Sequence, residues 1–473
     1  MKNNLLASVA GLFCAVFCAL FLNACAPAQN QMALVQGPLK VSRENPRYFT
    51  DGSGKAIYLT GSHTWDNLVD MGTADFQAEF DFPRYLHWMK EYNHNFMRLW
   101  TWELMNWETE KAVKDRTVEY FVAPHPWLRT GPGTALDGKL KFDLSQFDPV
   151  YFERLKQRVE QAADSGIYVS IMLFEGWGLQ FIPNAYERHP FHPDNNINGI
   201  IGDSDGDGNC TEIHTLGNHA ITSLQEGYIR KVIDVVNEFD NVLYEISNEN
   251  HPPSTEWQYH TTRFIKEYEK NLAKQHPVGM TFQYKGGENS TLFNSPADWI
   301  SPNNKDGYAD DPPPSDGSKV IITDTDHLWG IGGNETWVWK SFLRGLNPIF
   351  MDAYQGRILN WKSDSSWVEP VRRSMGQTLM LAGRMDLIAM IPEPGLASSG
   401  YCLANAGKAY LVYLPDSLGV EVNLEKAAGL FDAEWFNPKS GQFKRSEAIR
   451  GGDKLSFHSP FGTTGTLLYL KAR

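Results

Sequence analysis

Short apolar stretches and amphipathic stretches alternate along most of the chain. We expect strands at the apolar stretches 57–61, 96–100, 168–174, 242–247, 278–282, 298–301, 320–323 and 349–352. Between several of them apolar residues recur every three or four positions, which predicts helices at 82–90, 148–164, 225–238, 255–274 and 368–385. This alternation predicts an α/β fold, a (β/α)8 or TIM barrel, over residues 40–395. A doubly wound sheet is the alternative, but the glycine-rich first turn typical of that fold is absent from the sequence.

From about residue 396 the pattern changes to short segments in which apolar and polar residues mostly alternate. Residues that favour turns separate these segments, which we expect to be strands at 409–414, 420–424, 433–436, 454–457 and 466–470. The pattern predicts a small antiparallel β-sandwich over residues 396–473.

The first 24 residues have the features of a bacterial lipoprotein signal peptide. Lys2 supplies a positive charge, residues 5–22 carry none, and small Ala24 precedes Cys25. A short membrane span is the alternative for such a stretch, but the sequence Leu22-Asn-Ala-Cys25 favours cleavage after residue 24 and lipidation of Cys25. We then expect residues 25–39 to be a tether from the membrane lipid to the fold. Because Asp does not follow the cysteine, an outer-membrane location is favoured, and the face of that membrane stays open.

Composition and charge restrict the class of partner. The 473-residue chain has a formal net charge of −13, which disfavours binding to the phosphates of nucleic acid. Its 15 Trp and 19 Tyr residues suit a carbohydrate cleft, because the apolar faces of sugars stack on rings, although a large aromatic core is the alternative use. Beyond the signal peptide and Cys25, the cysteines are Cys210 and Cys402, and we expect both thiols to be unpaired.

Two of the predicted strands lead into carboxylates. Glu249 follows the stretch 242–247, and Asp326 follows the stretch 320–323. Carboxyl ends of barrel strands meet at one mouth, where the chemistry of TIM barrels takes place. Hydrolysis of a glycosidic bond requires a pair of carboxylates. We therefore predict that Glu249 protonates the leaving oxygen and that Asp326 attacks the sugar or activates water, without a cofactor; Asp324 is the alternative to Asp326.

Other residues at or beside the predicted strand ends are candidate contacts of a bound sugar. Glu175 is a third carboxylate among them, which could bind hydroxyls or tune the pKa of a neighbour. The full set is Arg98, Asn248, His63, Trp65, Trp100, Trp102, Glu175, Trp177, Tyr284, His327 and Trp329. The sequence contains neither His-Glu-x-x-His nor Gly-x-Ser-x-Gly, so the signatures of zinc proteases and of α/β-hydrolases are absent.

An acidic loop gives a separate signal for a metal ion. Asp203, Asp205 and Asp207, followed by Gly208, match the start of an EF-hand-type calcium loop. The twelfth position holds His214 instead of the usual Glu, and Glu212 lies two residues early. We expect a structural Ca²⁺ here, and a solvated acidic turn is the alternative.

The chain resembles the apiosidase-like (β/α)8 glycoside hydrolases over roughly residues 40–395. The resemblance rests on His63-Thr-Trp65, Arg98-Leu-Trp-Thr-Trp102, Tyr244-Glu-Ile-Ser-Asn-Glu249 and Asp326-His-Leu-Trp329. These residues also resemble those of a clan of retaining barrel glycosidases that carry Asn-Glu at the end of strand four. That resemblance implies that Asn248 holds a sugar hydroxyl, that Glu249 is the acid/base and that Arg98 supports the nucleophile. That clan carries Glu on strand seven, so the Asp here leaves retention and inversion both open.

The tail resembles the small collagen-binding β-sandwich that often follows such barrels. The matching residues are Tyr401-Cys-Leu-Ala404, Tyr410-Leu-Val-Tyr-Leu-Pro415 and Trp435-Phe-Asn-Pro-Lys-Ser-Gly441. We expect this sandwich to brace the barrel rather than to bind collagen, because fold analogy alone does not establish binding. The resemblance implies a lipid-anchored enzyme of polysaccharide degradation. The alternatives are a glycan-binding lipoprotein without catalysis, suggested by the missing strand-seven Glu, and an adhesin that acts through the tail.

Overall fold

The structure of the protein is a computed structural model that describes residues 37–73, 79–108, 118–356, 358 and 366–473. The predicted signal peptide, Cys25 and most of the predicted tether lie outside these residues. Within the described ranges, no helix combines the length and the apolar composition that a membrane span requires.

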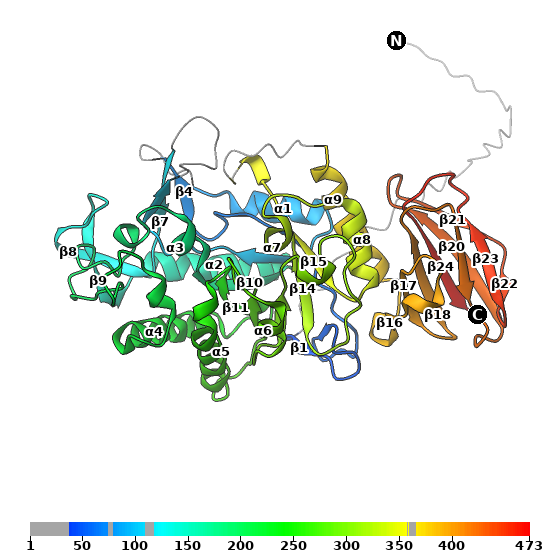
Figure 1. The fold of residues 1–473 in the computed structure, drawn as a ribbon, viewed down its shortest axis with the longest axis horizontal. Coiled ribbons are helices and arrows are strands. Elements are labelled where there is room, and N and C mark those ends of the chain that lie inside the picture. The colour runs from blue at the N-terminus through cyan, green and yellow to red at the C-terminus, as the bar shows by residue number, and fades with distance from the viewer. Residues whose placement is uncertain (1–36, 74–78, 109–117, 357, 359–365) are drawn as a thin grey trace, which may run out of the picture. The chain divides into compact units, whose positions relative to one another are not determined.

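Eight parallel strands close into a barrel, which confirms the predicted fold class (Figure 1). Every residue in these strands is buried, as is usual for parallel strands covered by helices, and this burial explains why they read as continuous apolar runs. The strands are β3 (Gly61–His63), β5 (Phe96–Leu99), β10 (Tyr168–Glu175), β11 (Val242–Asn248), β12 (Val278–Thr281), β13 (Trp299–Ser301), β14 (Val320–Asp324) and β15 (Asn347–Met351).

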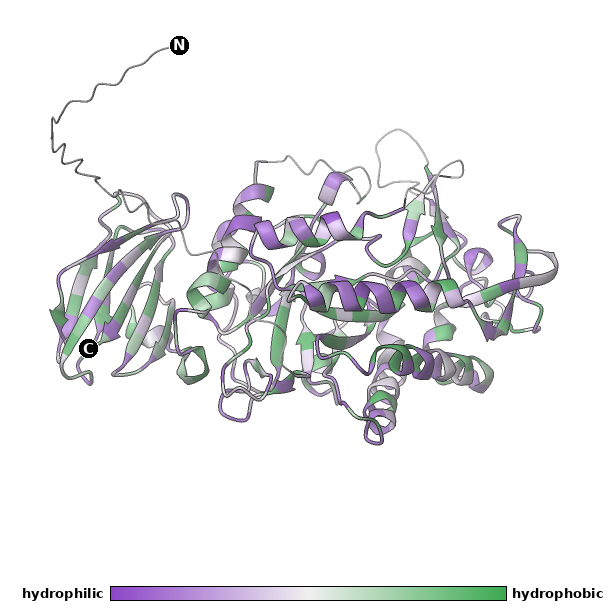
Figure 2. Ribbon diagram, turned by 180° about the vertical axis from the view of Figure 1, so that it is seen from behind, coloured by the Kyte–Doolittle hydropathy of each residue, from purple (hydrophilic) through white to green (hydrophobic). Residues whose placement is uncertain are grey.

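The helices around the barrel are amphipathic, and along them hydrophilic and hydrophobic positions follow one another in Figure 2. In α2 the N-cap Asp148 accepts a hydrogen bond from the backbone N–H of Val150, and Pro149 occupies the first turn. The longer helices are α1 (Phe82–Glu91), α2 (Pro149–Asp164), α4 (His219–Val236), α5 (Thr255–Glu269), α8 (Glu335–Leu343) and α9 (Val368–Ala382). Short helices are α3 (Trp177–Phe181), α6 (Asn289–Phe293) and α7 (Thr325–Trp329).

The first barrel strand lies later in the chain than the apolar pattern indicated. We predicted it at 57–61, but β3 begins at Gly61 and ends at His63. Ile57 instead pairs with Phe49 in an isolated antiparallel bridge. Leu59 and Phe49 belong to an apolar cluster together with Phe96 of β5. The stretch is therefore buried as predicted, but it packs at the entry to the barrel wall instead of forming the wall.

Two small sheets that the sequence did not predict precede α2. One contains β4 (Asp70–Gly72), β6 (Asn106–Glu108) and β7 (Glu119–Ala123), and the other is the hairpin of β8 (Trp127–Thr134) and β9 (Leu140–Phe147). A further short pair near the start joins β1 (Lys40–Val41) to β2 (Phe49–Thr50).

The C-terminal segment is an antiparallel β-domain, as predicted. Its larger sheet has the order β16-β17-β18-β24-β20-β21, with β22 paired to β20, and β19 pairs with β23. A buried cluster that includes Val412, Val422 and Trp435 fills the core between them. Cys210 and Cys402 are free and buried, which confirms the predicted unpaired thiols. The strands are β16 (Ile391–Pro392), β17 (Cys402–Asn405), β18 (Ala409–Leu414), β19 (Gly419–Asn423), β20 (Leu430–Asn437), β21 (Gln442–Arg445), β22 (Ile449–Arg450), β23 (Lys454–His458) and β24 (Thr466–Ala472).

Candidate active site

A cleft of about 640 Å³ opens at the carboxyl ends of the barrel strands. Glu249 and Asp326 both line it, so the two predicted catalytic carboxylates face the same space. Its walls are largely aromatic, and they include six of the predicted sugar contacts in addition to Asn248: Trp65, Trp100, Trp177, Tyr284, His327 and Trp329. This is the arrangement of a ligand cleft with a few polar groups on an apolar wall.

Glu249 is the first residue after β11, and its backbone is left-handed with φ of 45°. A non-glycine residue in this region is strained and is held there by its surroundings. The backbone N–H of Glu249 donates to Thr281 Oγ1 at 3.3 Å, and its carbonyl accepts from Gln180 Nε2 at 2.9 Å. The turn therefore ends the strand at Asn248 and holds the following carboxylate at the mouth.

Asp326 lies just past β14, in the first turn of α7. Asp324, the last residue of β14, caps that helix because its Oδ1 accepts the backbone N–H of Asp326 at 3.0 Å. Asp324 and Asp326, the two candidates for the second catalytic carboxylate, therefore lie in different places. Asp326 lines the cleft, whereas Asp324 is completely buried beneath it.

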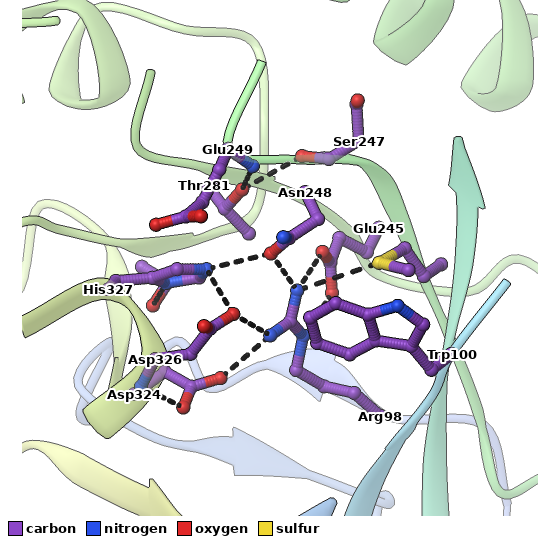
Figure 3. Close-up of polar contacts among 12 residues, drawn as sticks. Arg98, Trp100, Glu245, Ser247, Asn248, Glu249, Thr281, Asp324, Asp326 and His327 are labelled. Atoms are coloured by element: carbon purple, nitrogen blue, oxygen red, sulfur yellow. Dashed lines mark hydrogen bonds and ion pairs between the residues drawn. The ribbon is translucent and has the colours of Figure 1, made fainter. Parts of the chain in front are cut away.

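Arg98 of β5 is at the centre of the polar network (Figure 3). It binds Glu245 through two nitrogens, with Nε to Oε2 at 2.8 Å and Nη2 to Oε1 at 2.6 Å. Its Nη1 donates to Asp324 Oδ2 at 2.9 Å and to Asp326 Oδ2 at 3.2 Å. Its Nη2 also donates to Asn248 Oδ1 at 2.6 Å. A single buried guanidinium therefore positions three carboxylates and the amide that precedes Glu249.

The side-chain oxygen of Asn248 is held by two partners in this network. Its Oδ1 accepts from Arg98 and lies 3.1 Å from His327 Nε2, while His327 Nδ1 lies 2.6 Å from Ser301 Oγ. Burial lowers the pKa of His327 well below its ordinary value, so the ring is neutral. The neutral ring with its proton on Nε2 donates to Asn248, and Ser301 then donates to Nδ1.

The two cleft carboxylates differ in the charge that their surroundings favour. Burial, followed by the nearby charge of Asp326, raises the pKa of Glu249 well above its ordinary value. Burial and the charge of Asp324 raise the pKa of Asp326 to about 7, against the opposing effect of Arg98. Burial alone would raise the pKa of Asp324, but His63 and Arg98 lower it below its ordinary range. Near neutral pH the arrangement therefore keeps a proton on Glu249 more readily than on Asp326.

Four of the predicted contact residues lie behind the cleft wall instead of lining it. The first is Arg98, described above. The second is His63, which stacks on Trp100 with ring centroids 5.5 Å apart and whose Nε2 lies 2.9 Å from Asp324 Oδ2. Trp102 donates to the carbonyl of Trp65 at 2.9 Å. In Glu175, both carboxylate oxygens accept the backbone N–H of Gly178, and burial raises the pKa of this side chain to about 8. These side chains support the wall, and none of them is among the residues that line the cleft.

The acidic loop brings its three aspartates together. One ligand oxygen each from Asp203, Asp205 and Asp207 lies within 4.8 Å of the others. Both carboxylate oxygens of Asp203 already accept backbone N–H groups, from Gly206 at 2.7 Å and from Gly208 at 2.9 Å. The predicted calcium site stays a prediction.

One charged group beside the site was not indicated by any pattern in the sequence. Glu103, in the loop after β5, accepts the backbone N–H of Glu175 at 2.9 Å and lies close to His189 and His214. Its partners follow far along the chain, His189 at a separation of 86 residues. Only the fold brings these residues together, so no spacing in the sequence could have revealed them.

Comparison with protein families gives two partial matches. Residues 115–285, which include β10, β11 and Glu249, match a family described only as a domain of unknown function, DUF6298. Residues 389–466 match a family described as a putative collagen-binding domain of a collagenase, in agreement with the resemblance noted for the tail. No curated protein matches the chain.

Solved structures show the same fold at low sequence identity. A glycoside hydrolase superposes with a TM-score of 0.60 at 12% identity, over 92% of this chain and 97% of its own. A glycoside hydrolase family 5 protein from Bacteroides vulgatus ATCC 8482 gives 0.58 at 13% identity, over 92% of this chain and 94% of its own. The chain thus has the fold of glycoside hydrolases of this type, with a TIM barrel followed by an antiparallel β-domain.

Proposed function

We propose that this protein is a glycoside hydrolase that acts on a polysaccharide or oligosaccharide with Glu249 as general acid. The observation that supports this best is the pair of buried carboxylates, Glu249 and Asp326, in one cleft with aromatic walls. The fold that the chain shares with glycoside hydrolases agrees with the proposal.

The surroundings of the two carboxylates support a division of roles. Glu249 carries the proton that the leaving oxygen needs, because burial and the neighbouring Asp326 disfavour its charge. Asp326 accepts a hydrogen bond from Arg98, which stabilises the carboxylate form that attacks the anomeric carbon or activates a water molecule. We expect Nδ2 of Asn248, whose Oδ1 is already bound by Arg98, to donate to a sugar hydroxyl next to the bond that is cleaved.

Activity tests on purified variants decide between catalysis and binding. The wild type is incubated with plant and algal polysaccharides and oligosaccharides, beside Glu249→Gln, Asp326→Asn and the control Glu335→Gln. We expect the first two variants to lose at least about 10³-fold in sugar release, as expected for loss of a catalytic carboxylate. The control should keep its activity because Glu335, at the start of α8, does not line the cleft. A wild type that is inert on every glycan but retained by one would replace this proposal with the glycan-binding alternative.

Two further measurements test the finer assignments. If Asp324→Asn abolishes hydrolysis while Asp326→Asn does not, the nucleophile or base is Asp324. The anomer released first, followed by NMR, distinguishes retention from inversion.

We also propose that the protein is a bacterial lipoprotein held at the outer membrane through acylated Cys25. The support is the sequence Leu22-Asn-Ala-Cys25 after a charge-free stretch.

A further inference from the structure

The strained turn at Glu249 is clamped from both sides. On one side Thr281 Oγ1 accepts the N–H of Glu249 at 3.3 Å and donates to the carbonyl of Ser247 at 2.8 Å. On the other side Gln180 Nε2 donates to the carbonyls of Glu249 and Gly176, each at 2.9 Å. A left-handed glutamate persists only where its surroundings impose that backbone. The direction in which the Glu249 carboxylate points therefore depends on what holds these neighbours.

Glu103 is the charged group behind this clamp. Its Oε2 accepts the backbone N–H of Glu175 at 2.9 Å and lies 3.0 Å from His214 Nε2. Burial by itself would raise the pKa of Glu103, but His214 and His189 lower it to about 2, so the side chain is a carboxylate at any working pH. Glu103 does not line the catalytic cleft; with His189 it borders a separate cavity of about 30 Å³.

Two short routes connect Glu103 to the turn. In the first, His214 Nδ1 accepts from Asn250 Nδ2 at 2.8 Å, and Asn250 is the residue next to Glu249. His214 is itself held by stacking on Trp257, with ring centroids 4.5 Å apart.

The second route runs through the backbone at the end of β10. Glu103 holds the N–H of Glu175, and the next residue, Gly176, packs so tightly on Asn250 that an added Cβ would lie 2.6 Å from its Cα. Gly176 also donates its N–H to the carbonyl of Asn248 at 2.9 Å. Both residues that flank Glu249 are therefore in contact with elements that Glu103 fixes.

We propose that Glu103 is a positioning residue for the general acid, which it holds in place through His214 and Asn250 and through the backbone of Glu175 and Gly176. This inference rests on the proposed hydrolase function and extends it to a residue outside the cleft. An ionised carboxylate suits the role because its Oε2 accepts the backbone N–H of Glu175 in a charge-assisted hydrogen bond, which is stronger than a neutral one, and lies 3.0 Å from His214 Nε2.

Another glutamate that pairs with a histidine provides a matched control. Glu269 at the end of α5 also pairs with a histidine, because its Oε1 lies 2.7 Å from His276 Nδ1. It accepts from the hydroxyl of Tyr244, near the opposite end of β11 from Glu249. Glu269→Gln thus removes another Glu–His pair without touching the turn.

The test compares leaving groups of different quality. Aryl glycosides of the sugar that the wild type releases are prepared with a poor leaving group, such as a phenol, and with a good one, such as 2,4-dinitrophenol. A good leaving group departs without a proton, so damage to the general acid lowers turnover of the poor substrate far more than that of the good one. The variants are Glu103→Gln, Glu269→Gln and, as the benchmark for lost acid catalysis, Glu249→Gln.

We expect Glu103→Gln to lose about 10²-fold in kcat on the phenyl glycoside, the size of effect that a misplaced catalytic group causes, and less than about 5-fold on the dinitrophenyl glycoside. Glu269→Gln should stay within about 3-fold of the wild type on both, as a variant away from the reacting groups should. Equal losses of Glu103→Gln on the two substrates would overturn the proposal, because a merely structural role lowers both rates alike.

A second variant covers poor folding of Glu103→Gln. His214→Phe preserves a ring that stacks on Trp257 but removes the link from Glu103 to Asn250. We expect this variant to show the same dependence on the leaving group. A folded His214→Phe variant without that dependence would also overturn the proposal. A wild type that cleaves neither glycoside nor its parent glycan would instead refute the proposed hydrolase function, and the positioning role with it.

Discussion

Replacing Asp326 by asparagine should make the protein more stable than the wild type as the pH rises. The pKa of this carboxyl is raised from 3.8 to about 7 in the folded protein by burial and by the charge of Asp324. A carboxyl with a raised folded-state pKa binds its proton more tightly in the folded chain than in the unfolded chain. Folding stability therefore falls as the pH rises from 3.8 towards 7, and above 7 the full loss remains.

The magnitude follows from the width of that interval. Between pH 5 and about pH 7, an interval of about 2 pH units, Asp326 is ionised in the unfolded chain but still protonated in the folded protein. Each unit lowers the free energy of unfolding by about 1.36 kcal/mol, so the wild type loses roughly 3 kcal/mol between pH 5 and pH 8. The asparagine side chain carries no charge, so the Asp326→Asn variant avoids this loss. Relief of Glu249, whose pKa the charge of Asp326 raises, acts in the same direction.

Urea unfolding of wild type and variant at pH 5 and pH 8, followed by circular dichroism, measures the difference directly. The variant for comparison is Asp324→Asn, two residues away. Its folded-state pKa is lowered, so the stability that its charge provides is lost only as the pH falls below 3.8. Because the charge of Asp324 also raises the pKa of Asp326, Asp324→Asn should destabilise the protein less at pH 8 than at pH 5. A stability difference between Asp326→Asn and wild type that is the same at pH 5 and at pH 8 would contradict a raised pKa of Asp326.

Three other outcomes are expected. Arg98→Met should cost about 3–5 kcal/mol in the free energy of unfolding by urea, because Glu245 and Asp324 are left buried without their cation; a loss below about 1 kcal/mol would mean that water replaces the guanidinium. Trp329→Ala should raise KM about 5-fold with little change in kcat, since the half-exposed ring lines the cleft as a stacking surface; a drop in kcat alone in steady-state kinetics would contradict a binding role. If the loop at Asp203 binds Ca²⁺, millimolar CaCl₂ should raise the Tm of wild type but not of Asp203→Ala in calorimetry.

The barrel was predictable because its strands are buried on both faces, which leaves a continuous apolar signature in the sequence. The same signature does not mark where along an apolar stretch the strand lies, and the segment around Leu59 was therefore assigned to the wall when it packs against Phe49 instead. The strands of the two small sheets before α2 were missed, because β8 carries glycines and proline and has only two buried residues.

The position of the candidate site was predictable from the ends of the predicted strands, because residues just past these ends lie at the mouth of the barrel. Glu249 and Asp326 meet at one mouth because each lies just past the carboxyl end of a parallel strand, which is a property of the topology. Whether a side chain at such an end lines the cleft or lies behind it depends on neighbours from other strands. Trp100 covers His63 in this way. Glu103 was missed altogether, since its partners come from distant loops.

The burial of both thiols has a practical consequence for optical measurements. Cys210 and Cys402 are 0% and 1% exposed, and burial raises the pKa of both, that of Cys402 to about 12. Thiol reagents attack accessible thiolates, so neither of these native side chains will react under mild conditions. A cysteine introduced by Lys285→Cys, on the exposed rim of the cleft, would then be the single reactive thiol between residues 37 and 473. A fluorophore attached there would report the arrival of a glycan by its emission, with every native cysteine retained.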